Sequence, residues 1–516
     1  MKEVTSSLLG RTWQMLKTAG AVIRLSRAQE ETVAANAARF LAENLGGMKG
    51  LPQKLGQILS MSEESLAQTY APLTGNSQPL DFEVVEKVLV RAWERPVNQV
   101  VSHIEPGGLA ASLGQVHRAT LITGESVAVK VQYPGILKAV EIDLKMLGWL
   151  MAPLGGFAKG FDLKSYQTVV LEDIQQELDY LAEAENQNLY GVMARYIQGL
   201  AVPKVYGKLC TPQVLVTAWE EGVPLQAVAE TWNEEDRRRA GRVFLSASLE
   251  TLFKNGMTQG DLHPGNFRFR KTSRGEVEMV LYDFGCMFQP SLDSRLALLR
   301  LVELTDANTT GDPYPLFLKL GFNPDYLEPL ADKLPALSRV MLEPFLVNGP
   351  YPLDGWHLGE RVADILGDDR WNFRVAGPAE LILLMRIFHG YIHTLKILGV
   401  DVSWKFALDP IRRQFYDQAM GLALPVAENP DRGFGTMAKY MYIQVIRDGQ
   451  VKVRITSPLN MVDNLRLTMD DELLAKVAAR GINLDELARR VRKSGYRPQE
   501  VFSLEENDKT VRIWLE

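Results

Sequence analysis

Two short polar segments constrain this chain of 516 residues more than any other feature. The first, GDLHPGNF, sets Asp261 and Asn266 five residues apart around a tight Pro-Gly turn. The second, YDFG, places Asp283 at the end of an expected strand, 17 residues after Asn266. In such a pair of loops the first carboxylate faces a nucleophile, while the amide oxygen and the second carboxylate ligate a metal ion. The pattern therefore predicts phosphoryl transfer, with Asp261 as a catalytic residue and Asn266 and Asp283 as metal ligands.

A lysine on an expected strand and an acidic helix precede these loops. The strand 126–132 carries Lys130 in the run VAVKV, where an ammonium reaches the phosphates of a nucleotide if a carboxylate holds it in place. The helix expected at 165–196 contains ELDYLAEAEN, and its Glu183 is the candidate partner of Lys130. By itself an acidic helix is usually a solvated surface. The order Lys, Glu, Asp-x4-Asn, Asp-Phe-Gly is nevertheless typical of kinases, so Lys130 and Glu183 join Asp261 as catalytic candidates.

Three features of ordinary protein kinases are missing from the sequence. A Gly-x-Gly-x-x-Gly loop does not precede Lys130, and GGLAASLGQVHRA at 107–119 stands in its place. Asp261 is not part of a His-Arg-Asp tripeptide, and no Ala-Pro-Glu follows YDFG, because a helix is expected at 292–304. An open segment that binds a peptide is therefore not expected.

The run KLGQ, in an expected N-terminal helix, adds a more specific motif of the form KxGQ. With it, the sequence resembles the UbiB-like (AarF, ABC-one) atypical kinases, which include the mitochondrial coenzyme Q proteins, over about residues 30–420. The resemblance implies that ATP or ADP binds with Mg²⁺, that Lys130 pairs with Glu183, and that Asn266 and Asp283 hold the metal. It also implies a role linked to isoprenoid quinones or lipids.

The resemblance further assigns residues that contact the nucleotide. The KxGQ motif corresponds to Lys54 and Gln57, and the family's ExD motif to Glu177 and Asp179. In the family the KxGQ helix lies across the site where a protein kinase admits its peptide, so we expect no efficient phosphorylation of peptides in trans. The family's Ala-rich loop corresponds to Ala110, Ala111, Ser112, Gly114, Gln115 and Val116. Leu109 replaces the first of the usual three alanines. Ala111 is expected to set the preference between nucleotides.

The expected fold is α+β, a two-lobed protein-kinase-like fold with an N-terminal helical extension and a small C-terminal β-α-α-β module. The two strands of this module are expected at 451–456 and 511–515, because apolar and polar residues alternate there. The expected regions are the extension with the KxGQ motif at 1–98, the kinase-like N-lobe at 99–225, the helical C-lobe at 226–425, and a linker with the small module at 426–516.

Composition narrows the classes of partner. The chain has 57 Lys and Arg against 63 Asp and Glu, a net charge of −6 that gives no chain-wide reason to bind nucleic acid. Its two cysteines are too few for a zinc cluster or a disulfide framework. Neither a signal peptide nor 18 consecutive uncharged apolar residues is visible, so we expect a cytoplasmic protein without a transmembrane segment. Peripheral membrane contact stays open, as does a lipid or a quinone-precursor small molecule as a partner beside the nucleotide.

Two functions stay open from the sequence. One is an atypical kinase or ATPase whose acceptor is water, a small molecule, a lipid-linked intermediate or the protein itself. The other is a nucleotide-gated binding protein with negligible turnover, in which the nucleotide changes the N-terminal cap. The complete set of Asp261, Asn266 and Asp283 favours the enzyme, because a decayed site usually loses its metal ligands.

Overall fold

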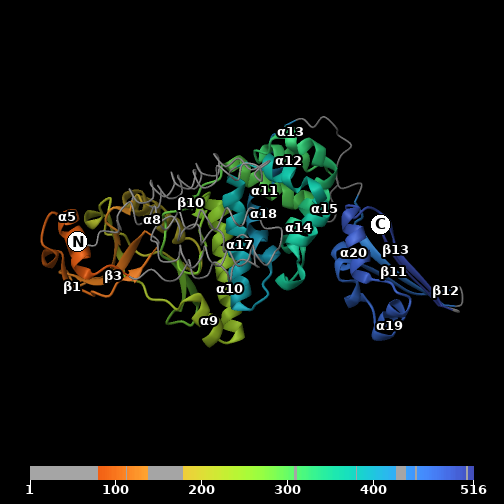
Figure 1. Cartoon of the computed structure of the whole chain (residues 1–516), viewed down its shortest axis with the longest axis horizontal. Helices are drawn as coiled ribbons and strands as arrows, with labels where there is room; N and C mark the ends of the chain where they lie inside the picture. Colours follow the sequence, from red (N-terminus) through yellow and green to blue (C-terminus); the bar gives the residue numbers. More distant parts are fainter. Residues whose placement is uncertain are drawn as a thin grey trace, which may run out of the picture. The chain divides into compact units, whose positions relative to one another are not determined.

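The computed structural model describes residues 79–111, 113–136, 178–306, 311–378, 380–425, 437–447, 450–506 and 509–516 (Figure 1). These residues form two compact units. Those of the first unit lie within Met1–Thr251, Met257–Gln289 and Ile382–Gly399, and those of the second within Leu252–Gly256, Pro290–Leu381 and Val400–Glu516. Within this part of the chain, no helix is both long and apolar enough to cross a membrane.

A five-stranded antiparallel sheet in the first unit carries the expected lysine. Along one of its strands Val127 and Val129 are buried on one face, while Lys130 lies on the other face because successive side chains alternate. Four strands pair in the order β1 (Val101–Ile104), β3 (Gly114–Leu121), β4 (Ser126–Gln132) and β6 (Val214–Ala218), and β3 also pairs with β2 (Leu109–Ala110).

Two helices cover opposite faces of this sheet. Helix α5 (Phe82–Trp93) shares a core with the valines of β4 and β6. Helix α8 (Tyr180–Ala194) packs on the other face against Leu215, the neighbour of Lys130 in the pairing of β4 with β6. The carboxylate of Asp179 caps α8 by accepting hydrogen bonds from two backbone N–H groups of the first turn. This cap sets where the helix begins and so places Glu183 in its first turn, on the face of the sheet that carries Lys130.

Two small sheets hold the polar loops of the first unit. Strand β7 (Thr258–Gln259) pairs with β10 (Met287–Phe288), while β5 (Leu200–Ala201), β9 (Val277–Leu281) and β8 (Phe267–Lys271) form a second sheet. Because the loop with Asp261 joins β7 to β8 and the loop with Asp283 joins β9 to β10, each loop is fixed at both of its ends.

Three helices support these loops, namely α9 (Leu225–Thr231), α10 (Glu234–Glu250) and α17 (Glu380–Leu398). Helices α10 and α17 run side by side (Figure 1), and the rings of Phe244 and Tyr391 meet edge to face at 5.9 Å between them. Both rings are fully buried, so α17 belongs to the core beneath the loops.

Among the described residues, the first part of the second unit consists of seven helices with short 3₁₀ turns between them. Their shared core includes Leu301, Phe317, Leu330 and Leu337, all nearly inaccessible to solvent. The helices are α11 (Leu292–Thr305), α12 (Tyr314–Lys319), α13 (Pro324–Leu327), α14 (Leu334–Leu346), α15 (Leu358–Leu366), α16 (Arg370–Ala376) and α18 (Trp404–Met420).

The C-terminal part of this unit has more strands than the sequence analysis expected. The expected strands at 451–456 and 511–515 lie within β12 (Gln450–Pro458) and β14 (Lys509–Leu515), but β11 (Tyr440–Arg447) and β13 (Gln499–Glu506) complete a sheet in the order β12-β11-β14-β13. Two strands alone are at best marginally stable, whereas this sheet buries one face against other elements. The elements between β12 and β13 are a 3₁₀ segment, Leu459–Thr468, and the helices α19 (Asp471–Ala479) and α20 (Leu484–Lys493).

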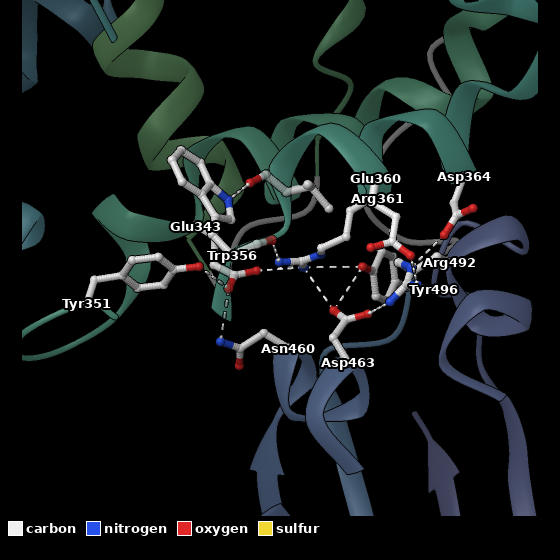
Figure 2. Close-up of polar contacts among 11 residues, drawn as sticks. Glu343, Tyr351, Trp356, Glu360, Arg361, Asp364, Asn460, Asp463, Arg492 and Tyr496 are labelled. Carbon is white, nitrogen blue, oxygen red and sulfur yellow. Dashed lines mark hydrogen bonds and ion pairs between the residues drawn. The ribbon is translucent and has the colours of Figure 1, made fainter. Parts of the chain in front are cut away.

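A buried ionic cluster, which we call the junction cluster, connects this sheet module to α14 and α15 (Figure 2). Arg361 contacts Glu343 at 2.7 Å and Asp463 at 2.9 Å, with all three side chains at most 8% exposed. Arg492 contacts the other oxygen of Asp463 and a carboxylate oxygen of Asp364, each at 2.9 Å. The hydroxyls of Tyr351 and Tyr496 donate to Glu343 and Asp463, so the network is extensively hydrogen-bonded.

Candidate active site

Strand β4 and helix α8 bring together a buried ion pair in the first unit. Lys130 Nζ lies 2.7 Å and 2.9 Å from the two carboxylate oxygens of Glu183. The Glu183 side chain is 0% exposed and that of Lys130 is 18% exposed. The ring of Tyr180 lies beside the ammonium, with its centroid 4.9 Å from Nζ. The structure thus brings together the two residues that the sequence analysis paired.

The two carboxylates near Lys130 keep it charged. Burial disfavours the ammonium, but Asp283 and Glu183 outweigh that effect and raise the pKa of Lys130 well above its usual value. Burial raises the pKa of Glu183 to about 7 against the opposing pull of Lys130. These two shifts act in opposite senses on the pair. The short contacts from Nζ to both carboxylate oxygens support a charged lysine at neutral pH.

The loop after β9 places Asp283 beside this pair. Lys130 Nζ is 3.4 Å from Asp283 Oδ2, and the backbone N–H of Gly285 donates to Asp283 Oδ1. Asn186 of α8 donates to the backbone oxygen of Phe284 at 3.2 Å, and the Phe284 ring packs edge to face on Tyr190. Helix α8 therefore holds both Glu183 and the Asp-Phe-Gly loop. Asp283 keeps 28% of its side chain exposed, so it is accessible to a ligand.

A glutamine that the sequence analysis did not single out links the two polar loops. Gln259 Nε2 donates to the backbone oxygen of Asp283 at 2.6 Å, and its Oε1 accepts from the backbone N–H of Asp261 at 3.2 Å. Asn266 Nδ2 donates to the backbone oxygen of Asp261 at 2.9 Å. Gln259 is 1% exposed, so its amide needs these partners, and no sequence pattern displays that requirement. The two loops are thereby held in one arrangement.

Arg386 of α17 also contacts the site and was missed from sequence. Its guanidinium lies 2.9 Å from Asp261 Oδ2, and the two side chains are 11% and 7% exposed. The available signal was an arginine within a mostly apolar helix, because a buried charge needs a partner. Sequence spacing does not predict this contact, since the two residues are 125 positions apart.

The Ala-rich loop divides into exposed and buried parts. Ala110 is exposed on β2, Ala111 and Val116 are half-buried, and the backbone N–H of Ala111 donates to the backbone oxygen of Gly114. A Cβ on Gly114 would lie 2.4 Å from the backbone oxygen of Val131, so glycine is required where β3 meets β4.

Gln115 is buried in the sheet and forms hydrogen bonds within the protein. Its Oε1 accepts from the backbone N–H of Leu80, while its Nε2 donates to the Leu80 oxygen and to His117 Nε2. His117 Nδ1 then donates to the Glu105 oxygen at 2.7 Å, so these bonds define a neutral tautomer. The side chain of Gln115 thus bonds to Leu80 and His117, whereas the sequence analysis expected it to contact the nucleotide.

Asp179 has its structural role as the cap of α8 and is exposed. The other four candidates, Lys54, Gln57, Ser112 and Glu177, lie outside the described residues, as does the expected helical extension up to residue 78.

The donors in the two loops suit a hard cation. Because the Asn266 nitrogen donates to Asp261, its amide oxygen faces away from that bond, and Asp283 contributes a partly exposed carboxylate. Mg²⁺ prefers such oxygen ligands and commonly takes only one or two from protein, with phosphate and water supplying the rest. The described residues contain no group of three or more His, Cys, Asp and Glu that could hold a metal. These donors fit an Mg²⁺ ion whose remaining ligands come from a phosphate and from water.

An antiparallel sheet with a Lys–Glu pair, followed by helices that support Asp-x4-Asn and Asp-Phe-Gly loops, defines the two-lobed α+β protein-kinase-like class. Residues 72–310 match the family model of the ABC1 atypical kinase-like domain. The resemblance to the UbiB-like atypical kinases is therefore confirmed.

Relatives from several organisms match about half of the chain. An ABC1 family protein of Schizosaccharomyces pombe is 31% identical over 249 residues, 46% of this chain and 46% of that protein. The mitochondrial atypical kinase coq-8 of Caenorhabditis elegans is 31% identical over 258 residues, 49% of this chain and 34% of that protein. The chain thus spans half or less of the length of these two relatives. A Mycobacterium tuberculosis protein solved with erythromycin gives a TM-score of 0.48 at 22% identity, over 78% of this chain and 98% of that one.

Proposed function

We propose that this protein is an atypical kinase or ATPase that binds Mg-ATP and transfers or hydrolyses the terminal phosphoryl group. The observation that carries the proposal is the buried pair of Lys130 and Glu183, with Lys130 Nζ 3.4 Å from Asp283 Oδ2. Three segments far apart in the sequence supply these residues. Burying a charged group such as Lys130 is costly. The partly exposed carboxylate of Asp283 beside it is the kind of group that a site for phosphate and a metal needs.

Each residue has a role in the proposed reaction. Lys130, held by Glu183, would bind the α- and β-phosphates, and Asp261 would face the nucleophile that attacks the terminal phosphorus. Asn266 and Asp283 would hold Mg²⁺, which supplies neutralisation of the charge on the phosphates. Gln259 would keep the two loops at one separation through its bonds to both. Phosphoryl transfer needs little covalent chemistry from the protein, so positioning and charge supply the catalysis.

The finer assignments rest on the family resemblance. We propose that Lys54 and Gln57 contribute from the N-terminal helix, that Glu177 and Asp179 face the nucleotide, and that Ala111 influences the preference between ATP and ADP. A link to isoprenoid quinone or lipid metabolism, with a lipid or quinone precursor as a partner, is part of this proposal. The relative named coq-8 supports it at the level of the family.

Nucleotide binding tests the proposal directly. We expect Asp283→Asn to weaken Mg-ATP binding at least about tenfold, or about 1.4 kcal/mol, because Asn266 alone would hold the metal. Thermal stability without nucleotide should stay nearly unchanged, since Asp283 is partly exposed. The matched control is Asp325→Asn at an exposed position on α13 of the second unit.

The readouts are calorimetric affinity, the shift in melting temperature with Mg-ATP, and release of inorganic phosphate with and without quinone-precursor phenols. An equal nucleotide-induced shift in wild type and Asp283→Asn would show the metal assignment to be wrong. Tight binding with negligible phosphate release under every condition would instead favour the nucleotide-gated binding protein.

A further inference from the structure

The contact between Arg386 and Asp261 adds a second cation to the candidate site. Arg386 Nη2 lies 2.9 Å from Asp261 Oδ2, and both side chains are nearly buried. Arg386 belongs to α17 and contacts the loop between β7 and β8, which we call the catalytic loop, whereas Lys130 belongs to β4 and contacts the Asp-Phe-Gly loop. The site therefore has one cation from the sheet and another from α17.

The helix that carries Arg386 is seated closely on the catalytic loop. A Cβ on Gly390 would lie 2.7 Å from the Cβ of Leu262, so a glycine is needed for α17 to come this near. Gly390 is one turn beyond Arg386 and therefore on the same face of the helix. Leu262 directly follows Asp261 and is 2% exposed. The close approach at Gly390 thus places Arg386 beside the carboxylate of Asp261.

The charges around the loops favour a role beyond pairing. The described contacts join the carboxylates of Glu183, Asp261 and Asp283 to two cations, Lys130 and Arg386. Phosphate groups bring further negative charge, so each cation has a large effect on whether they bind. A guanidinium has five N–H donors, which lets one arginine bind a carboxylate and a phosphate at once.

We propose, resting on the proposed function, that Arg386 binds the terminal phosphate of the nucleotide and so favours a nucleoside triphosphate over a diphosphate. Lys130 serves the α- and β-phosphates, while Asp261 faces the acceptor at the far end of the phosphate chain. A cation bonded to Asp261 belongs to that same far end. An arginine supplied from elsewhere in the chain stabilises the charge of the transferred group in other phosphoryl-transfer proteins.

Affinities for a triphosphate and a diphosphate test the inference. The full chain and its Arg386→Gln variant are titrated calorimetrically, in the presence of Mg²⁺, with ADP and with adenylyl imidodiphosphate, a triphosphate that resists hydrolysis. We expect Arg386→Gln to weaken the triphosphate about tenfold and ADP less than about twofold, because one charged hydrogen bond to the terminal phosphate is lost. The control is Arg237→Gln, which removes an arginine bonded to the backbone of Leu398 at the other end of α17 and should change neither affinity.

The same substitution in an Asp261→Asn protein distinguishes a direct contact between Arg386 and phosphate from an effect of the charge of Asp261. Asp261→Asn removes the unpaired carboxylate that Arg386→Gln would otherwise leave. If Arg386 binds phosphate, the double variant therefore binds the triphosphate more weakly than Asp261→Asn alone. Loss of the effect in that background, or equal weakening of both nucleotides, would overturn the inference alone. Wild-type protein that bound neither nucleotide would overturn the proposed function, and this inference with it.

Discussion

The two buried ionic clusters of this molecule differ in their access to solvent. In the junction cluster of the second unit, Arg361 and Arg492 face Glu343 and Asp463, and each of these four side chains is at most 9% exposed. In the site of the first unit, Lys130 faces both Glu183 and Asp283, and Asp283 is 28% exposed. The carboxylates of the first cluster are buried against arginines, with Asp364 at 14% exposed, whereas the second cluster holds a carboxylate that solvent reaches.

This difference separates a structural role from a functional one. A buried network whose charged groups contact one another connects elements in one arrangement and leaves little access for a ligand. An unmatched carboxylate beside a lysine is costly unless a cation or another partner completes it. Access to a charged group within a buried cluster, rather than burial alone, therefore identifies the candidate site.

The largest expected effect is on the junction cluster. Arg361→Ala leaves Glu343 and Asp463 buried without this partner, and we expect the free energy of unfolding of the second unit to fall by about 3–5 kcal/mol. Chemical denaturation followed by circular dichroism measures the loss. Arg466→Ala, which breaks an exposed pair with Asp485, should cost less than about 1 kcal/mol. Similar losses in the two variants would contradict the structural role given to the junction cluster.

A smaller loss that depends on pH is expected for Lys130→Met. Glu183 already has a pKa of about 7 through burial, and without the lysine its neutral form becomes more favourable still. Its pKa in the folded state is then further above the unfolded value of 4.5, so the variant is most stable at acidic pH and loses stability as the pH rises from there to the raised pKa of the folded state. Melting temperatures of wild type and variant, measured at intervals over about pH 5–9, give the difference in stability at each pH.

Glu185→Gln, at an exposed position on the same helix, is the control for the lysine variant and should not change this pH dependence. A gap between Lys130→Met and wild type that stayed constant over the whole pH range would mean that Glu183 does not take up a proton when its partner is removed.

The smallest effect concerns the neutral network of His117. Burial lowers the pKa of His117 against the opposing hydrogen bond to the Glu105 oxygen, so its pKa in the folded state lies below the unfolded value. Stability from this group is present above about pH 6.5 and falls as the pH decreases below it, by no more than about 1.4 kcal/mol per pH unit. Comparing His117→Gln with the exposed His103→Gln over pH 5–8, the chosen range, tests this, and equal slopes would argue against it.

Local patterns in the sequence point to residues that the structure then brings together. Asp261, Asn266 and Asp283 lie in short loops whose spacing is visible in the sequence; the structure places Asp283 beside Lys130, and Gln259 links its loop to the loop of Asp261. Gln259 and Arg386 were not predicted, because their roles depend on contacts that no spacing encodes. The two extra strands of the C-terminal sheet were also missed, since a strand with one covered face is defined by its neighbours as much as by its own alternation.

By itself the sequence determined the kinase-like order of motifs, the alternation that sends Lys130 and the valines of β4 to opposite faces, and the polar loops. These features depend on residues a few positions apart, where backbone geometry alone relates one side chain to the next. Tertiary structure decided that Glu183 is the carboxylate that meets Lys130, that α17 brings Arg386 to Asp261, and that Arg361 joins α15 to the C-terminal module. Such contacts bring together charges from distant segments, and packing of the intervening core sets which of them meet.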